Sequence, residues 1–464
     1  MSTVRIFNHH VKTPFLLLGL IEVVGIIGSV YAAMFVRFWR EEIPYEQVWL
    51  QTLVFALIML LAMIASGLYQ ARLREGGFGF FLRLIASYLM GTAGASAIFY
   101  IFPDLFFGRG ILILTMVISF AFITIVRMGM YFFNPNIFKR RVLVLGGGKR
   151  ASALTELRRR VDQFGFVILG FVHMRGEQDI VAPEKIIKID TPLVQYTNTQ
   201  DIDEIVLAID DRRKGIPMQE LLDCKMQGVD IVDMVSFFER ETGKIRIDQL
   251  QPSWLLFSEG FKHSVWRDGS KRAFDLLASG FLLAISWPLM MVTVLAIWAE
   301  SGFKYKTPIL YRQVRVGIEG RPFQVFKFRS MVVNAEQGGK AQWATKNDSR
   351  VTRVGRIIRK TRIDELPQMY NVFRGDMSFV GPRPERPEFV VMLAEKILYY
   401  SERHRVKPGI TGWAQLLYPY GSTEHDAMEK LQYDLYYVKN QSIFLDFLIL
   451  LQTAEVVLFG RGAR

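Results

Sequence analysis

The residues best suited to chemistry lie in one basic segment, which reads RVGRIIRKTRIDELPQMYNVFRGDMSFVGPRPER at positions 353–386. An adjacent carboxylate pair, Asp364-Glu365, stands in it, and a Gly-Pro-Arg-Pro sequence follows at 381–384. One carboxylate could attack phosphorus, and the other could hold Mg²⁺, which neutralises phosphate oxygens. Arginine presents a planar charged fork that matches phosphate. The segment therefore predicts a polyphosphate site beside two carboxylates, surrounded by six cationic residues: Arg353, Arg356, Arg359, Lys360, Arg362 and Arg374.

Local signals place the carboxylate pair at the start of a helix. Thr361 precedes the pair and Pro367 follows it, an order typical of a helix N-terminus. That end of a helix is electropositive and offers free N–H groups to a phosphate. The charges alone favour a non-catalytic interpretation. In it, the basic residues face solvent or anionic lipid, and the acidic pair only caps a helix.

The rest of the sequence favours the catalytic interpretation, because it resembles a known family. Residues 268–459 are similar to the catalytic domain of the monotopic phosphoglycosyl transferases, bacterial sugar transferases that act on polyprenyl phosphate. The N-terminal layout resembles the long, membrane-bundle form of the family. The segment after GWAQ is similar to the branch associated with exopolysaccharide and exosortase systems. The matching stretches are KRAFDLLASGFLLAISWPLM, LYRQVRVGIEGRPFQVFKFRSM, RKTRIDELPQMYNVFRGDMSFVGPRPERPEF and RHRVKPGITGWAQ, in the family's order.

The resemblance implies a two-step reaction at the start of exopolysaccharide or glycan synthesis. Asp364 attacks the β-phosphate of a UDP-sugar, which releases UMP and leaves a phosphosugar on the enzyme. Polyprenyl (undecaprenyl) phosphate then accepts the sugar-1-phosphate. By position, the resemblance makes Asp364 the nucleophile and Glu365 the partner of Mg²⁺, and it assigns phosphate binding to Arg359, Arg383 and Lys327. It also implies a homodimer.

Residues 309–331 alternate in polarity and carry turn signals at Glu319-Gly320, which predicts a short hairpin. Lys327 and Arg329 are two positions apart, so on a strand they share a face and could reach one phosphate together. Asp434, in the aromatic stretch YDLYY, is a weaker candidate, because packing explains that stretch as well. The polar segment 334–350 suits either a loop that closes over substrate or a passive connector.

The composition points to a membrane protein of two or three domains. Of its 464 residues, 51% are hydrophobic, and the net charge is +13. This charge fits anionic lipid or a polyanionic substrate. A nucleic-acid partner is not expected, because no zinc-finger spacing or RNA-binding signature occurs. The single cysteine, Cys224, excludes an intramolecular disulfide.

Four apolar segments predict a four-helix transmembrane bundle over residues 1–137. They lie at 15–36, 48–69, 80–102 and 110–132, each about 20 residues and so long enough to cross the hydrocarbon core. The basic bias of the loops favours both ends in the cytoplasm. With the resemblance, this predicts a multi-pass protein of the bacterial inner membrane whose later domains face the cytoplasm. No pair of acidic residues lies in these segments, so we expect anchoring and not transport.

Residues 138–250 alternate between strand-like and helix-like runs, which predicts a Rossmann-like α/β domain. Gly146, Gly148 and Ala151 fit the dinucleotide pattern G-x-G-x-x-A after the first strand. The acid expected after the second strand is absent, and His173 and Met174 stand there. Gly146 and Gly148 are therefore weak nucleotide-binding candidates, and a structural or oligomerising role is favoured.

The remaining residues, 251–464, predict a mostly helical catalytic domain with one long apolar run at 271–300. Pro288, two residues after Ser286, breaks this run. Because basic residues flank both ends, we expect a re-entrant helix that enters and leaves by one leaflet. This agrees with the family's fold and places Asp364 at the level of the lipid headgroups. A straight crossing, the alternative, would put Asp364 outside the cell. The tail after 443 is expected to lie on the membrane.

Two other functions compete with sugar-phosphate transfer. A membrane-anchored nucleotide-sugar dehydratase requires a dinucleotide site and a Tyr-x-x-x-Lys pair, and no Tyr-x-x-x-Lys occurs in the chain. A non-enzymatic scaffold for polysaccharide assembly would leave the arginine-rich segment, KFRSM and GPRP without a shared purpose.

Overall fold

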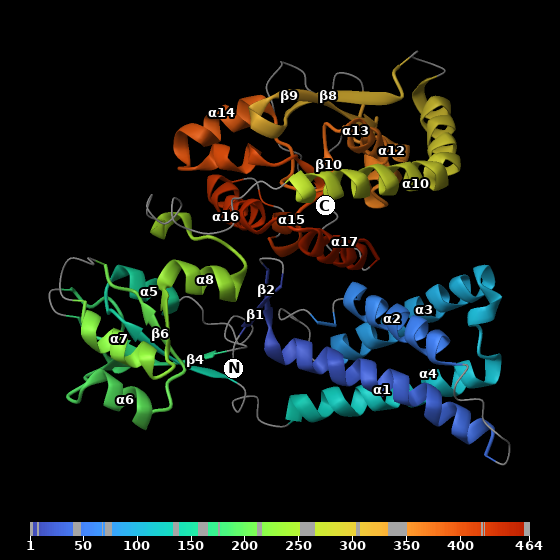
Figure 1. Cartoon of the computed structure of the whole chain (residues 1–464). Coiled ribbons are helices and arrows are strands. Elements are labelled where there is room, and N and C mark those ends of the chain that lie inside the picture. The colour runs from blue at the N-terminus through green and yellow to red at the C-terminus, as the bar shows by residue number, and fades with distance from the viewer. Residues whose placement is uncertain are drawn as a thin grey trace. The chain divides into compact units, whose positions relative to one another are not determined.

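A computed structural model provides the fold of the chain (Figure 1). It divides into two compact units, residues 1–243 and 244–464, which are described separately. The residues described are 3–6, 9–39, 48–66, 68–69, 77–132, 139–155, 166–174, 177–210, 216–250, 265–302, 307–332, 350–418, 421 and 423–458.

The first unit begins with a small hairpin of β1 (Thr3–Ile6) and β2 (His9–Lys12), followed by apolar helices. These helices are α1 (Thr13–Arg37), α2 (Trp49–Ala65), α3 (Gly77–Ile101) and α4 (Arg109–Phe132), and a 3₁₀ turn, η2 (Pro103–Leu105), precedes α4. They confirm the four predicted apolar helices. Helix α1 packs along α4 and α2 along α3. By length and composition, α1, α3 and α4 could each cross a membrane, whereas α2 is shorter.

A buried ion pair joins α1 to α4. Arg127 donates from Nη2 to Oε2 of Glu22 at 2.8 Å and from Nε to the other oxygen. Glu22 also accepts from the hydroxyl of Tyr69, and both charged residues are buried. A buried charge is costly unless it is paired, so this contact favours one register of α1 against α4. No local sequence pattern marks this pair, because its two residues lie 105 positions apart.

The rest of this unit contains a parallel five-stranded sheet in the order β5-β4-β3-β6-β7. Val142 and Val144 of β3 face one apolar cluster, and Leu143 and Leu145 face the other, so the sheet is buried on both sides. This confirms the predicted parallel sheet. The strands are β3 (Arg140–Leu145), β4 (Phe166–Val172), β5 (Ile186–Ile187), β6 (Glu204–Leu207) and β7 (Asp230–Asp233); the helices are α5 (Lys149–Thr155), η4 (Pro183–Lys185), α6 (Leu193–Thr199), α7 (Met218–Met226) and α8 (Met234–Thr242).

The second unit is mostly helical, with an antiparallel hairpin (β8, β9) and a parallel pair (β10, β11). Its core is rich in aromatic side chains, including Tyr436 and Trp413. Residues 244–250, which the sequence analysis assigned to the preceding domain, supply Ile245, Ile247 and Leu250 to this core. The elements are η5 (Ile247–Gln249), α10 (Val265–Ile297), η6 (Trp298–Gly302, a π-helix), β8 (Leu310–Val316), η7 (Ile318–Gly320), β9 (Pro322–Phe328), α12 (Arg353–Lys360), η8 (Ile363–Glu365), α13 (Gln368–Arg374), β10 (Ser378–Val380), α14 (Pro387–Lys396), η9 (Tyr400–Arg405), β11 (Gly409–Thr411), α15 (Trp413–Leu417), α16 (Glu424–Asn440) and α17 (Ile443–Leu458). The expected loop at 334–350 lies almost wholly outside the described residues.

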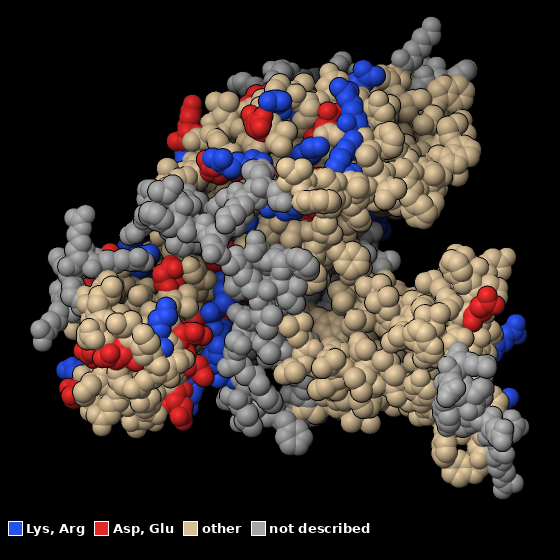
Figure 2. Space-filling view, viewed as in Figure 1, with Lys and Arg blue, Asp and Glu red and all other residues tan. Residues whose placement is uncertain are grey.

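Helix α10 is apolar and bent. It runs for 33 residues with Pro288 inside it, and Figure 1 shows that it changes direction sharply along its length. Large apolar side chains on it stay exposed, including Phe281 at 65% and Val292 at 62%. In Figure 2 this part of the surface carries almost no charge, and a band of Lys and Arg side chains runs beside it.

Both ends of α10 form hydrogen bonds to the segment between Val354 and Val380 of the second unit. Near its start, Lys271 donates to the carbonyl of Val380 at 3.2 Å. Just beyond its end, Glu300 accepts from the main-chain N–H of Val354 at 3.1 Å. A straight helix of this length would separate its ends by about 50 Å. The bend instead returns the chain to the segment between Val354 and Val380.

Candidate active site

The carboxylate pair lies on a tight turn between two helices. Thr361 ends α12 and its hydroxyl donates to the carbonyl of Ile357 at 2.9 Å, so it does not cap the next helix as predicted. Arg362 then adopts a left-handed backbone conformation, with φ at 59°, which breaks the helical path. Asp364 and Glu365 follow on η8, and α13 begins only at Gln368. The carboxylate pair thus lies in the first turn of a helical segment, as predicted, but Arg362 and not Thr361 is its N-cap residue.

Two cations from different elements converge on Glu365. Lys327 of β9 donates to its Oε1 at 2.9 Å, and Arg383 donates to the same oxygen at 3.2 Å. Asn371 of α13 holds the strand in place: its side chain accepts from the N–H of Phe326 at 3.1 Å and donates to the carbonyl of Gln324 at 2.7 Å. The register between β9 and α13 therefore determines that Lys327 reaches Glu365.

The two carboxylates differ in their surroundings. Burial raises the pKa of Asp364 above its ordinary value, and the charge of Glu365 adds to the rise. Burial also acts on Glu365, but the charges of Lys327 and Arg383 outweigh it and hold the pKa of Glu365 well below its usual range. The surroundings thus favour the ionised form of Glu365 beside the cations. Asp364 has a buried Oδ1 that accepts no hydrogen bond among the described residues.

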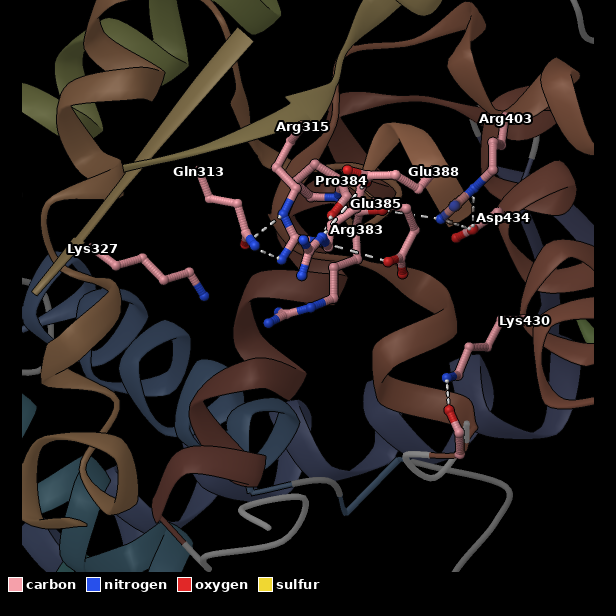
Figure 3. A network of polar contacts seen from close by, with 12 residues as sticks. Gln313, Arg315, Lys327, Arg383, Pro384, Glu385, Glu388, Arg403, Lys430 and Asp434 are labelled. Carbon is pink, nitrogen blue, oxygen red and sulfur yellow. Dashed lines mark hydrogen bonds and ion pairs between the residues drawn. The ribbon is translucent and has the colours of Figure 1, made fainter. Parts of the chain in front are cut away.

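The loop at 381–384 is held by main-chain contacts from two sides (Figure 3). Arg315 of β8 donates to the carbonyl of Pro384 at 3.1 Å, and Arg403 of η9 donates to the carbonyl of Arg383 at 3.0 Å. Arg403 is itself held by Asp434 of α16, at 2.7 and 3.1 Å, and both residues are buried. These contacts fix the backbone from which Arg383 extends toward Glu365.

The start of α10 is tied to the strand that leads into this loop. Asp275 accepts from the hydroxyl of Ser378 at 3.0 Å and from the N–H of Phe379 at 3.1 Å. Lys271 donates to the carbonyl of Val380, to Tyr437 and to Asp446. Since β10 ends at Val380, immediately before Gly381, the exposed apolar helix and the loop at 381–384 share one buried polar framework.

Comparison with known proteins decides the family. The family model described as bacterial sugar transferase matches residues 266–460. An undecaprenyl-phosphate glucose phosphotransferase from Komagataeibacter xylinus is 32% identical over 397 residues, which cover 78% of this chain and 72% of that protein. The chain belongs to the bacterial sugar transferase family. This confirms the resemblance stated from the sequence.

Two further relatives of this sugar transferase carry related names. A UDP-N-acetylgalactosamine-undecaprenyl-phosphate N-acetylgalactosaminephosphotransferase from Aeromonas hydrophila is 41% identical over 55% of the chain and 58% of its own length. An undecaprenyl-phosphate galactose phosphotransferase from Salmonella typhimurium is 31% identical over 70% of each protein. All three relatives are named as phosphotransferases, in agreement with the expected class of enzyme. Their names differ in the sugar.

In this bacterial sugar transferase, the predicted phosphate-binding residues are only partly together. Lys327 and Arg383 meet at Glu365, and the positive charge of Arg359 lies close enough to lower the pKa of Asp364 against the effect of burial. Arg329 is separate: it is buried, its N–H donates to the carbonyl of Ile309, and its electrostatic partner is Glu300. Strand β9 ends at Phe328, so Arg329 lies just beyond the strand and does not share a face with Lys327 as predicted.

The Gly-rich turn of the sugar transferase is filled by its own acidic side chains. Asp210 accepts from the N–H groups of Lys149 and Arg150, both at 2.8 Å, where a bound phosphate would accept. A Cβ on Gly148 would lie 2.2 Å from an oxygen of Asp210. Nucleotide binding at Gly146 and Gly148 stays a prediction, and this arrangement supports the structural role that was favoured.

Sequence reasoning missed three residues that shape the site: Arg315, Asn371 and Arg403. Each acts on main-chain atoms far away in sequence, so no local motif marks its role. Asp434 was a weak candidate in its own right. The structure gives it a supporting position, because it reaches the loop through Arg403 and does not reach the carboxylate pair.

Proposed function

We propose that this sugar transferase moves a sugar-1-phosphate from a UDP-sugar to polyprenyl (undecaprenyl) phosphate, releases UMP, and forms a phosphosugar intermediate on Asp364. The observation that carries the proposal is the contrast between the two carboxylates. Glu365 is engaged by Lys327 and Arg383, whereas Oδ1 of Asp364 accepts no hydrogen bond among the described residues. Of the two carboxylates, we therefore assign Asp364 as the nucleophile. The names of the relatives supply the substrate classes.

The reaction would proceed by two displacements at phosphorus. In the first, a carboxylate oxygen of Asp364 forms a bond to the β-phosphorus as the bond to the UMP oxygen breaks. In the second, an oxygen of the lipid phosphate bonds to the same phosphorus and the carboxylate leaves. Arg383, Lys327 and Arg359 would hold the phosphate oxygens in place during both steps.

The residues present fit a magnesium ion. Mg²⁺ is usually held by one or two carboxylates, with phosphate oxygens and water completing its shell. Glu365 and Asp364 are such a pair of carboxylates, and no group of three or more His, Cys, Asp or Glu side chains suited to a metal occurs within the described ranges. When bound, the ion would neutralise negative charge on the phosphates.

We also propose the membrane arrangement expected from the sequence. The bundle would be multi-pass in the bacterial inner membrane, and α10 would be a re-entrant helix that places the site at the cytoplasmic headgroup level. Two observations support the re-entrant path. Both ends of α10 return to the segment between Val354 and Val380, and the apolar surface of α10 is exposed. A homodimer is part of the same proposal, and mass measurement of the protein in native-lipid particles tests it: a monomeric mass contradicts it.

The deciding experiment measures UMP release with Mg²⁺ by the full-length protein in membranes. UDP-glucose, UDP-galactose and UDP-N-acetylgalactosamine are supplied, each with and without polyprenyl phosphate. We expect one sugar to give UMP release that the lipid stimulates and that Asp364→Asn abolishes. Release of UDP would indicate ordinary glycosyl transfer and contradict the mechanism. No release with any donor would favour a non-enzymatic scaffold.

A further inference from the structure

Asp364 and Gln368 lie one turn apart on a continuous helical run. The backbone from η8 into α13 is linked by hydrogen bonds from Leu366 to Ile363 (3.1 Å), from Met369 to Leu366 (3.0 Å) and from Tyr370 to Pro367 (3.1 Å). Each of these bonds spans three residues, as in a 3₁₀ helix, so Gln368 follows Asp364 by slightly more than one turn. The two side chains therefore leave the same short segment of backbone.

Both side chains carry a buried polar atom with no partner among the described residues, and the two atoms are complementary. On Asp364 the atom is the acceptor Oδ1, and on Gln368 it is the donor Nε2. Gln368 is only 4% exposed. Buried polar groups are almost always hydrogen-bonded, and an unsatisfied one in a native protein points to a role in function or to a bond that forms with a ligand.

Gln368 faces the site and not the outer surface of α13. Asn371, three residues later on the same face, is buried and bonds to the main chain of β9 at Phe326 and Gln324. The next residue on that strand, Lys327, reaches Glu365. The opposite face of α13 carries Tyr370 and Phe373, which are about half exposed. Gln368 thus points into the space between β9 and the carboxylate pair.

We propose that Gln368 is a positioning residue for the nucleophile, an inference that rests on the proposed function. Its Nε2–H donates to Oδ1 of Asp364 when substrate is bound and fixes the plane of the carboxylate. The other carboxylate oxygen, Oδ2, then points at phosphorus and attacks. A neutral amide suits this task, because it orients the carboxylate without the full positive charge that engages Glu365.

The test replaces Gln368 with Met, which has a similar length but no donor. We expect Gln368→Met to lower kcat for UMP release by about 10- to 100-fold, the effect of one hydrogen bond to a charged group, with KM for the UDP-sugar within about twofold. Its melting temperature should stay the same or rise, because an unsatisfied buried amide has been removed. Gln368→Glu, which repels Asp364, should be at least as slow. Gln432→Met, a buried glutamine of α16 in the same unit, is the matched control and should keep full kcat.

The outcomes separate this inference from the proposed function. If the wild type releases UMP, Asp364→Asn does not, and Gln368→Met keeps its kcat, the positioning role is wrong and the function stands. A lower kcat that follows a lower melting temperature, with no difference between Gln368→Met and Gln432→Met, also overturns it. If the wild type releases no UMP, the proposed function fails, and the positioning role fails with it.

Discussion

Lys327 and Glu365 form the polar contact that gives the two adjacent carboxylates different surroundings. The ammonium lies 2.9 Å from Oε1 of Glu365, and Arg383 shares the same oxygen. Glu365 thereby keeps its charge and fixes two cations where phosphates would bind. Asp364, one residue earlier, has an Oδ1 that accepts no hydrogen bond among the described residues, in keeping with the proposed attack on phosphorus.

The same contact predicts how activity depends on pH. Burial raises the pKa of Asp364 above its ordinary value, so kcat should fall as the pH drops through that raised pKa, when the nucleophile takes up a proton. Burial lowers the pKa of Lys327, with Glu365 offsetting only part of the effect, so activity should also fall on the alkaline side below the usual lysine range. A pH profile of UMP release measures both limbs. In Lys327→Arg, which stays charged, the alkaline limb should move to higher pH; an unchanged alkaline limb would assign it to another group.

Breaking the pair between Arg403 and Asp434 should cost both stability and activity. Both side chains are buried, and removing one partner leaves an uncompensated charge, at a cost of about 3–5 kcal/mol. Asp434→Ala should therefore lower the melting temperature of the second unit. It should also reduce UMP release, since Arg403 holds the carbonyl of Arg383.

The control for Asp434→Ala is a more exposed ion pair, between Arg405 and Glu402. Both residues lie on η9, the 3₁₀ helix that also carries Arg403. Glu402→Gln should change stability by less than about 1 kcal/mol. If the two variants melt alike, the buried pair does not carry the stability assigned to it.

The buried contact between Lys271 and Asp446 should behave as a coupled pair. Lys271→Met leaves the carboxylate of Asp446 buried with one partner fewer. Asp446→Leu likewise leaves the ammonium of Lys271 buried with one partner fewer. Each single change should be strongly destabilising, whereas the double variant should recover much of the loss, because apolar side chains of similar size replace the pair. Thermal unfolding of all four proteins forms a double-mutant cycle. Strict additivity would show that the two residues do not interact.

The loop that carries Arg383 should not tolerate a side chain at its first residue. A Cβ on Gly381 would lie 2.3 Å from the carbonyl oxygen of Lys407, so Gly381→Ala must displace the backbone. We expect a loss of UMP release of at least about tenfold, the rate consequence of misplaced phosphate contacts. Gly280→Ala in α10, where a Cβ meets nothing within 4 Å, is the matched control and should remain fully active. Full activity of Gly381→Ala would mean that this loop can shift without consequence.

Cysteine labelling tests the re-entrant path of α10. In a Cys224→Ser background, Asp268→Cys stands before the bend and Glu319→Cys after it, on exposed side chains. A re-entrant helix requires both to react with an impermeant thiol reagent from the same side of the membrane. Asp104→Cys, in the exposed connection between α3 and α4, should react from the opposite side. Reaction of positions 268 and 319 from opposite sides would show that α10 crosses the membrane.

The sequence by itself determined the features that depend on neighbouring residues. Runs of apolar residues predicted the helices of the N-terminal unit, and short β-rich runs predicted the parallel sheet. The turn signal at Glu319-Gly320 predicted the hairpin between β8 and β9, and the structure confirms it. Asp364 and Glu365 stood out through their type and spacing. Hydrophobic periodicity, turn preference and helix propensity act over a few residues, so one segment contains all the information they need.

Only the tertiary structure decided which charges meet. The contact between Glu365 and Lys327 joins residues 38 positions apart, and that between Arg403 and Asp434 joins residues 31 positions apart. Glu22 and Arg127 are separated by 105 positions. The local pattern even misled at Arg329, which lies just beyond the end of β9 and is influenced electrostatically by Glu300. Arginine and lysine side chains are long and bind any nearby acceptor, so their partners depend on how strands and helices pack. That packing arises from the whole core, and no single stretch of sequence specifies it.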